Sequence, residues 1–526
     1  MAVDQDIGGP DHNEVIIALV AAVGTDVGMV GSEVAIELSE YGYETIPLRL
    51  SDFLAEEVGR NFFEKPFDEA LWDAMTAGDE LREKWGRGDA LALHAISDIV
   101  ATRNQRGGGA SEPPPLDRVA FVLRSLKTQD ELATLRAVYG PRLIVIGAYS
   151  SKEARIAHLA AQIESSRKTT DRATWVHQPE ELVERDEREE GVRGQDVSGT
   201  FHRADFFIRG SDQDETRADI QRILEILFGS PFRTPTRDEH GQFMAAGAAL
   251  RSAEFGRQVG AAIATNQGSI IAVGANEVPK ADGGSHWEED GPGNRDFEIG
   301  DIDTNREQFD KLAQRLTDHL DARVEHLIQD IGSDDRQVAA VLAGLREALR
   351  QALPGDLRTG GLKDLTEFGR AVHAEMNALL DALRRGAPVQ GATVYTTTFP
   401  CHNCARHIIG AGISRVVFVE PYAKSRAERL HADSMTLDGA PEKGKVSFEP
   451  FVGVAPRRYR ELFDAAAREQ LGHPPRSDKR GHKTTFDKST ALPVFTDGGL
   501  APFRPEAREY RAKELLALEH FDRHRS

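Results

Sequence analysis

The sequence predicts an α/β protein in which a doubly wound, mostly parallel sheet is followed by a three-layered α/β/α domain. Short β-branched apolar runs alternate with helix-period segments from residue 14 to residue 227. A stretch rich in Pro, Ser and Thr (229–237) then interrupts the pattern, and a second alternating set runs from residue 242 to residue 420. Strands that alternate with helices form sheets whose ligands bind at the carboxyl ends of the strands.

The first predicted domain covers residues 1–230 and opens as a βαβ unit. Residues 166–199 are highly charged and poor in apolar side chains, which predicts a lid or loop rather than core. The expected elements are a strand (14–20), a glycine-bearing turn (21–28), a helix (30–41), strands (43–50, 117–123, 142–149), a helix (152–165), a last strand (201–208) and a closing helix (216–227).

The turn at 21–28 stands where a phosphate-binding loop would stand. A Walker A loop needs G-x-x-x-x-G-K-[ST], and the aligned positions here carry Ala21, Asp26, Val27 and Gly28. The lysine and the hydroxyl are missing, and Asp26 adds a negative charge. We therefore expect a P-loop-like scaffold or regulatory domain rather than an ATPase. The residues expected to contact a nucleotide are Gly24, Thr25, Asp26, Arg124 and Lys127, with a solvated basic rim as the alternative for Arg124 and Lys127.

The second predicted domain covers residues 231–470, and residues 471–526 form a C-terminal extension. Residues 281–361 are predicted as an insertion, in which an acidic glycine-rich loop is followed by helices. His373 begins a helix that stops at Gly386. The other expected elements are a helix from residue 242, a strand pair (259–264, 269–274), a strand (392–398), a helix (401–410) and a strand (416–420).

Composition limits the classes of function. With 526 residues, of which 40% are hydrophobic and 2 are cysteines, the chain is expected to be a cytoplasmic globular protein without a disulfide framework. No apolar run is long enough to span a membrane, and the acidic start is unlike a signal peptide. The net charge of −20 opposes loose binding to nucleic acid and favours a small nucleotide held in a pocket.

Two short segments carry residues suited to catalysis. His373 and Glu375 stand in Val-His-Ala-Glu, and the chain's 2 cysteines, Cys401 and Cys404, stand in Pro-Cys-His-Asn-Cys. His373, Cys401 and Cys404 are ligand types for a catalytic Zn2+ whose fourth position is open to water. Glu375, in the same first helical turn as His373, is expected to move protons without binding the metal. The positive ends of the two helices favour thiolates.

Three other interpretations of these residues compete with a catalytic zinc. A Cys-x-x-Cys pair after a strand is typical of a thioredoxin-like dithiol, although such a protein has no need of the His-x-Glu pair. A structural zinc needs a fourth ligand, for which His402 and His407 are the nearby candidates. The third alternative is coincidence.

These motifs resemble the cytidine and deoxycytidylate deaminase superfamily. His373-Ala-Glu375 and Pro400–Cys404 carry that resemblance, and residues 251–261 and 274–279 are similar to its deoxycytidylate branch. Together with the altered phosphate loop, the whole chain resembles bacterial antiviral deoxycytidine-nucleotide deaminases, in which a P-loop-like domain precedes the deaminase domain.

The resemblance implies further site residues and partners. Asn276 would contact the sugar hydroxyl, Tyr422 would line the substrate pocket, and Arg251 and Lys280 would hold phosphate. A turn-forming role for Asn276 and a packing role for Tyr422 are the alternatives. The implied biology is depletion of deoxycytidine nucleotides during phage infection, with an allosteric nucleotide, a regulatory small RNA and a homo-oligomer as expected partners.

The main hypothesis is hydrolytic deamination of dCMP, dCTP or both at C4, with Glu375 as the proton shuttle. One rival is a base deaminase acting within RNA or DNA, which would need basic channels and stacking surfaces. The acidic balance and the presence of only 4 tryptophans argue against it. The other rival is a nucleotide- or RNA-sensing regulator centred on residues 1–230.

Overall fold

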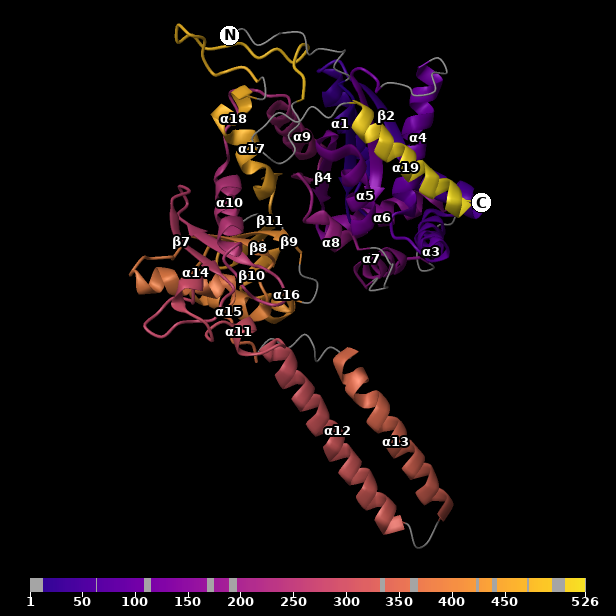
Figure 1. The fold of residues 1–526 in the computed structure, drawn as a ribbon, viewed down its shortest axis with the longest axis vertical. Helices are drawn as coiled ribbons and strands as arrows, with labels where there is room; N and C mark the ends of the chain where they lie inside the picture. The colour runs from indigo at the N-terminus through magenta and orange to yellow at the C-terminus, as the bar shows by residue number, and fades with distance from the viewer. Residues whose placement is uncertain are drawn as a thin grey trace. The chain divides into compact units, whose positions relative to one another are not determined.

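The computed structural model describes residues 13–62, 64–107, 115–167, 175–188, 196–331, 336–359, 368–421, 425–437, 442–470, 473–493 and 507–525. They form two compact units (Figure 1) and two six-stranded sheets, which confirms the predicted α/β class. The first unit consists of residues up to Phe243 together with Val419–Pro421 and the chain from Pro450 onward. The second consists of the remaining residues between Met244 and Glu449.

The sheet of the first unit has the strand order β12-β5-β4-β1-β3-β2. Neighbouring strands among β1 to β5 pair in parallel, whereas β12 is antiparallel to β5. Every residue of β1 is buried, as expected for a central strand covered on both faces. The bounds are β1 Val15–Val20, β2 Glu44–Arg49, β3 Val119–Leu126, β4 Leu143–Tyr149, β5 Phe206–Arg209 and β12 Gly453–Val454.

Some helices of this unit begin where a polar side chain satisfies one of their first N–H groups. Asp26 accepts the N–H of Met29 at the start of α1, and Thr128 with Glu131 forms a capping box at α5. The helices are α1 Val27–Ser39, α2 Leu50–Val58, α3 Phe67–Trp85, α4 Ala90–Arg106, α5 Gln129–Tyr139, α6 Lys152–Ser166, α7 Gln178–Arg188, α8 Val197–Phe201, α9 Gln213–Leu227, α17 Tyr459–Phe463, α18 Ala465–Gln470 and α19 Ala507–Arg525. A further helix, α10 (Arg237–Ala249), begins in this unit and continues into the second.

The prediction of a lid or loop over 166–199 was wrong for the described part of α7. Trp175, Leu182 and Val183 are buried in an apolar cluster with Met75 and Leu159. Charged residues dominate the composition of α7 and hide the apolar pair that anchors it. Residues 168–174 and 189–195 of that prediction lie outside the described residues.

The chain from Pro450 onward contributes elements to the first unit. β12 extends the sheet at the edge of β5, and α19 packs on α4 and α5. Figure 1 shows α19, in yellow, lying beside indigo helices from the start of the chain. The ranges 1–230, 231–470 and 471–526 stay predictions of sequence domains.

The sheet of the second unit has the order β10-β11-β9-β8-β6-β7, in which β6 is antiparallel to β7 and β8. A Cβ added at Gly260 would come within 2.0 Å of a backbone oxygen of α10, and one at Gly274 within 2.3 Å of the Ala374 oxygen of α14. Gly274 pairs with Ala261, the neighbour of Gly260, so the two glycines face opposite sides of the sheet. α10 and α14 therefore cover opposite faces, which makes three layers.

The bounds of these elements are β6 Gly260–Ala264, β7 Ile270–Ala275, β8 Thr393–Thr398, β9 Arg415–Glu420, β10 Met435–Leu437, β11 Val446–Pro450, α14 Ala374–Arg384, α15 His402–Gly410 and α16 Ala427–His431.

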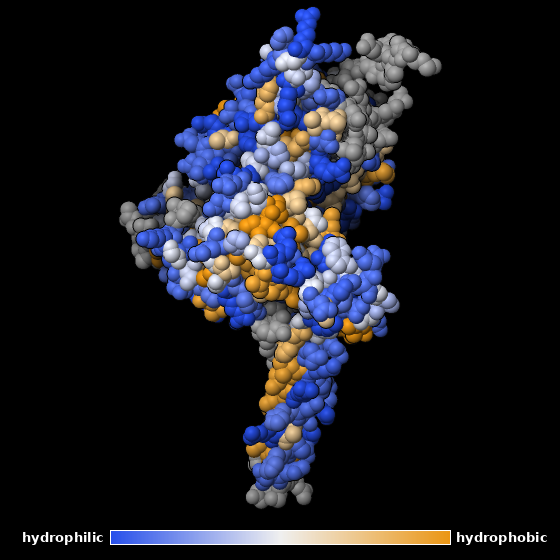
Figure 2. Space-filling view, turned by 90° about the vertical axis from the view of Figure 1, so that its left-hand side faces the viewer, coloured by the Kyte–Doolittle hydropathy of each residue, from blue (hydrophilic) through white to orange (hydrophobic). Residues whose placement is uncertain are grey.

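Between β7 and α14 the chain forms a short helix, α11 (Asp296–Ile299), and two long helices, α12 (Thr304–Ile331) and α13 (Arg336–Thr359). α12 and α13 lie side by side, and Arg346 of α13 pairs with Asp321 of α12. An apolar stripe runs along this pair (Figure 2), with exposed Leu316, Leu320 and Leu327 on α12 and Val341 and Leu345 on α13. Of the helices described, none is both long and apolar enough to cross a membrane.

A buried cluster of charges connects three distant parts of the first unit. Arg103 of α4, 1% exposed, donates from Nε to Glu14 at 2.9 Å, just before β1, and from Nη1 to Glu514 of α19 at 2.7 Å. Both carboxylates are buried, so removing Arg103 would leave two buried negative charges without their shared cation.

We expect Arg103→Ala to lower the free energy of unfolding by about 3–5 kcal/mol, because the buried carboxylates lose their partner. Arg106→Ala, in the same helix, should cost less than about 1 kcal/mol, because its pair with Glu44 is exposed. Urea unfolding followed by circular dichroism would measure both. An equal loss of unfolding free energy in the two variants would contradict a stabilising role of the buried cluster.

Candidate functional site

The end of β7 and the start of α14 hold one side of the candidate site. Glu277 and Val372 exchange two backbone hydrogen bonds, of 3.2 and 3.0 Å. Asn377 of α14 donates from Nδ2 to the Ala275 carbonyl at 2.7 Å. These contacts fix the first turn of α14, where His373 is the N-cap residue and Glu375 follows two residues later.

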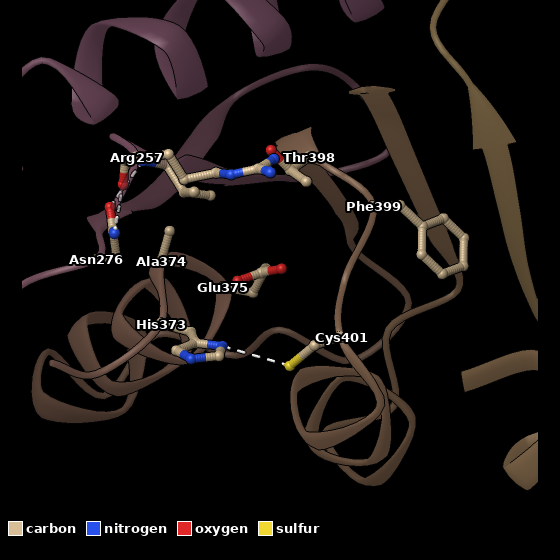
Figure 3. Close-up of a pocket in the computed structure, with 9 residues that line it drawn as sticks. Arg257, Asn276, His373, Ala374, Glu375, Thr398, Phe399 and Cys401 are labelled. Atoms are coloured by element: carbon tan, nitrogen blue, oxygen red, sulfur yellow. Dashed lines mark hydrogen bonds between the residues drawn. The ribbon is translucent and has the colours of Figure 1, made fainter. Parts of the chain in front are cut away.

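The other side of the site is the turn between β8 and α15. Cys401 is the N-cap residue of α15, and Cys404 lies in its first turn. Both cysteines are buried and neither forms a disulfide. Figure 3 shows His373 and Cys401 pointing toward each other from the ends of their two helices.

Three side-chain atoms converge between these helix starts. The Nδ1 atom of His373 lies 3.3 Å from the Sγ atom of Cys401 and 3.4 Å from that of Cys404. Zinc bonds of about 2.3 Å to sulfur and 2.1 Å to nitrogen, at tetrahedral angles, place sulfur and nitrogen about 3.6 Å apart. The spacing and the soft donor set therefore fit a zinc ion with one position free.

Hydrogen bonding distributes charge unevenly within this group. A hydrogen bond from Cys404 lowers the pKa of Cys401 to about 3, and the contact with Cys401 raises the pKa of His373 to about 9. The same Cys401 contact and burial raise the pKa of Cys404. A divalent cation would replace protons that this group holds, so its binding would depend on pH.

His373 and Cys401 line a pocket with a volume of about 230 Å3. Glu375 lines the same pocket. Its side chain is only 4% exposed, and burial raises the pKa of its carboxyl group. In Figure 3 the carboxyl group points into the space between His373 and Arg257. A buried carboxyl group with a raised pKa can take up and release a proton, as a general acid–base requires.

Asn276 also lines this pocket, and its side chain is already engaged. Oδ1 accepts the N–H of Val259 at 2.7 Å, and Nδ2 donates to the carbonyl of Arg257 at 2.8 Å. Asn276 thus fixes the loop before β6, while among the described residues one hydrogen of its amide and one lone pair of its oxygen have no partner. Its predicted contact with a sugar hydroxyl stays a prediction.

The structure does not bring Arg251 and Lys280 to the pocket. Arg251 stacks 3.8 Å above the Trp287 ring and donates to the carbonyls of Ser285 and His286, and Lys280 pairs with Asp290 on the surface. Neither lines the cavity. Tyr422 lies outside the described residues.

The positively charged side chain of Arg257 lines the pocket. Arg257 is not among the site residues that the sequence predicted. Figure 3 shows its side chain reaching across the pocket toward Thr398. It stands two residues before Val259, which also lines the cavity. Its position just before the predicted strand at 259–264 could have marked it as a candidate site residue. Arg251 and Arg257 share one segment, and only the fold decides which of them faces the site.

A group of three carboxylates lies elsewhere in the second unit. Single oxygens of Glu254, Asp296 and Asp303 lie within 4.8 Å of one another and could hold a cation. Burial and the neighbouring carboxylates raise the pKa of Glu254 to about 7. Asp296 also accepts hydrogen bonds from Thr304 and Arg370.

The residues predicted to bind a nucleotide in the first unit divide between two places. Gly24, Thr25, Arg124 and Lys127 line one cavity of that unit. Asp26 lines a separate, smaller pocket with Gly24, and its carboxylate caps α1.

Comparison with known proteins bears on the second unit. Residues 236–420 match the family model described as the cytidine and deoxycytidylate deaminase zinc-binding region. This range contains His373, Glu375 and both cysteines. Residues 236–420 contain a domain of the cytidine and deoxycytidylate deaminase superfamily. The deaminase domain thus carries the His/Cys/Cys group that can hold a metal.

Individual relatives match shorter parts of the chain. A deoxycytidylate deaminase of Enterobacteria phage T2 is 46% identical over 55 residues, which are 10% of this chain and 29% of the relative. ComE operon protein 2 of Bacillus subtilis (strain 168) is 37% identical over 91 residues, 15% of this chain and 48% of the relative. The chain thus spans less than half the length of these curated relatives.

A solved structure, the apo dCMP deaminase of cyanophage S-TIM5, aligns with 16% identity over 42% of this chain and 100% of its own, at a TM-score of 0.22.

We expect the purified chain to bind one zinc ion per polypeptide, and Cys404→Ser to lower its zinc content at least about tenfold, because one of three protein ligands is lost. His407→Ala is the matched control, because His407 lies exposed on α15 with its Nδ1 2.6 Å from the Asn403 carbonyl. Mass spectrometry of the metal content would measure both variants. Zinc loss in His407→Ala would instead indicate a four-ligand structural site.

Proposed function

We propose that the deaminase domain hydrolyses the 4-amino group of deoxycytidine nucleotides and releases ammonia and deoxyuridine nucleotides. The observation that carries this proposal is the convergence of His373, Cys401 and Cys404 beside a buried glutamate in one pocket. A thioredoxin-like dithiol would have no use for Glu375 at this place.

The residues of the pocket divide the reaction between them. His373, Cys401 and Cys404 would hold a zinc ion, whose Lewis acidity would make water a competent nucleophile near neutral pH. Glu375 takes the proton of the attacking water and delivers it to the ring nitrogen next to C4. It then assists proton transfer to the departing amino group, so that water and cytosine become uracil and ammonia.

Substrate recognition is assigned to the opposite wall of the pocket. Asn276 has an amide hydrogen left to bind the sugar hydroxyl, and the loop that it fixes carries Arg257. We assign the substrate phosphate to the Arg257 guanidinium, because it is exposed at the mouth of the pocket and always charged. This geometry suits dCMP, and an exposed cation leaves room for the longer phosphate chain of dCTP.

The proposal includes a biological role, which rests on the resemblance of the whole chain to antiviral deaminases. Hydrolysis of dCMP and dCTP would deplete the deoxycytidine nucleotides that phage replication needs. The second unit's small pocket and the chain's net charge of −20 favour free nucleotides over a nucleic-acid strand as substrates.

We expect Glu375→Ala to keep its zinc and to lose about 10²–10⁴-fold in the rate of ammonia release from dCMP, because the proton shuttle is removed. Ammonia release over a panel of dCMP, dCTP, CMP, CTP and deoxycytidine, with zinc content measured alongside, tests this. Glu289→Ala, an exposed glutamate of the same unit, is the control.

Full activity in Glu375→Ala would refute the mechanism. Turnover of a cytosine-containing oligonucleotide without turnover of any free nucleotide would refute the proposed class of substrate.

We expect Arg257→Ala to raise the KM for dCMP at least about tenfold, because a charged contact to the phosphate is lost. Turnover of deoxycytidine, which has no phosphate, should change by less than about threefold. Lys280→Ala is the matched control, since Lys280 pairs with Asp290 away from the pocket. Steady-state kinetics with both substrates would decide, and equal losses for dCMP and deoxycytidine would remove Arg257 from phosphate recognition.

A further inference from the structure

A second cavity, of about 410 Å3, lies in the first unit at the carboxyl ends of β1, β2 and β3. One part of its wall is polar, with Thr25 after β1, Arg49 at the end of β2, and Arg124 and Ser125 in β3. The other part is apolar and is formed by Leu50, Leu54, Phe67, Leu71, Met75 and Leu159. A cavity of this size holds a small molecule, and its two parts suit one with an anionic end and an apolar ring.

Two arginines stand side by side in the polar part. Arg49 and Arg124 are register partners in the parallel pair β2–β3, so their side chains leave the sheet on the same face. Within the described residues neither forms an ion pair, and the buried Nε atom of Arg124 has no hydrogen-bond partner. Burial and the neighbouring Arg49 lower the pKa of Arg124, which Asp26 offsets in part. Two adjacent cations that form no ion pair among the described residues favour an anion at this place.

Two hydroxyl groups of the same wall also lack partners. Thr25 is 7% exposed, and its Oγ1 atom makes no hydrogen bond among the described residues; the Oγ atom of Ser125 is likewise buried and unpaired. The methyl group of Thr25 packs toward Gly210, where an added Cβ would come within 3.0 Å of it. Buried hydroxyls are nearly always hydrogen-bonded, so these two indicate an absent polar partner.

The anion does not belong where a Walker A loop would hold it. The N–H of Val23 donates to Asp186 of α7 at 2.8 Å, and Lys127 donates to the Ala21 carbonyl at 3.1 Å with its Nζ 3.9 Å from the same Asp186. The carboxylate of Asp186 thus already binds the N–H at the start of the loop and lies near Lys127. The unpaired donors lie instead at the ends of β2 and β3.

We infer that this cavity binds a nucleotide, with its phosphate between Arg49 and Arg124, within reach of the Thr25 and Ser125 hydroxyls, and its base against the apolar wall. The site is separate from the deaminase pocket and uses the arginine pair in place of the missing Walker lysine.

Calorimetric titration of the full chain with AMP, GMP, dTMP and their triphosphates tests the inference. At least one of these nucleotides should bind, and its parent nucleoside should bind at least about tenfold more weakly, because the phosphate contacts the arginines. The double variant Arg49→Ala/Arg124→Ala should weaken nucleotide binding at least about tenfold. Arg60→Ala, which removes an exposed arginine paired with Glu80 in the same unit, should leave binding unchanged.

Two results would overturn the inference. Binding of none of the six nucleotides would do so, as would binding that Arg257→Ala abolishes and the double variant spares, because the ligand would then occupy the deaminase pocket. Thr25→Val, which keeps the shape of the side chain, should weaken binding without lowering the thermal unfolding midpoint. Ammonia release is not part of the readout, so failure of this inference and failure of the proposed deaminase activity are distinguishable.

Discussion

The candidate active site depends on how closely one helix approaches one strand. At Gly274 the backbone of α14 comes so near to β7 that a Cβ would lie 2.3 Å from the Ala374 oxygen. This contact places the first turn of α14, and with it His373 and Glu375, beside Asn276 at the end of the strand. A larger residue at 274 would push the helix outward and separate the histidine from the two cysteines, because protein interiors do not absorb such a displacement. The close packing of α14 on β7 therefore determines where His373 lies relative to the two cysteines.

The sequence predicted most of what is local and little of what depends on side-chain direction. His373-x-Glu375 and Cys401-x-x-Cys404 were placed at helix starts because short motifs carry their own geometry, and both are found there. Arg251 and Arg257 could not be told apart, since the direction of each side chain is set by partners distant in sequence, such as Trp287 for Arg251. The segment of α7 was predicted as a loop because its many charged residues obscure the two buried apolar residues, Leu182 and Val183, in the composition.

The two units handle negative charge in different ways. In the second unit, two thiols lie beside His373, and this group could hold a divalent cation. In the first, Asp186 stands where a Walker loop would hold phosphate, while Arg49 and Arg124 are left without a counter-ion among the described residues. In the inferred nucleotide site, the phosphate would be held mainly from the neighbouring strand ends, so an altered Walker motif does not by itself exclude a ligand.

The part that β12 and α19 play in the first unit has a consequence for the order in which the protein matures on the ribosome. The first sheet begins at Val15, yet the strand that completes it is Gly453–Val454, and Arg103 meets Glu514 only when α19 has been made. Domains generally fold as they emerge during synthesis. Here the earliest unit must wait, with an open sheet edge and a half-neutralised arginine, while the entire deaminase domain is translated. The nascent chain thus acquires its complete metal-ligand set before the unit that precedes it is finished.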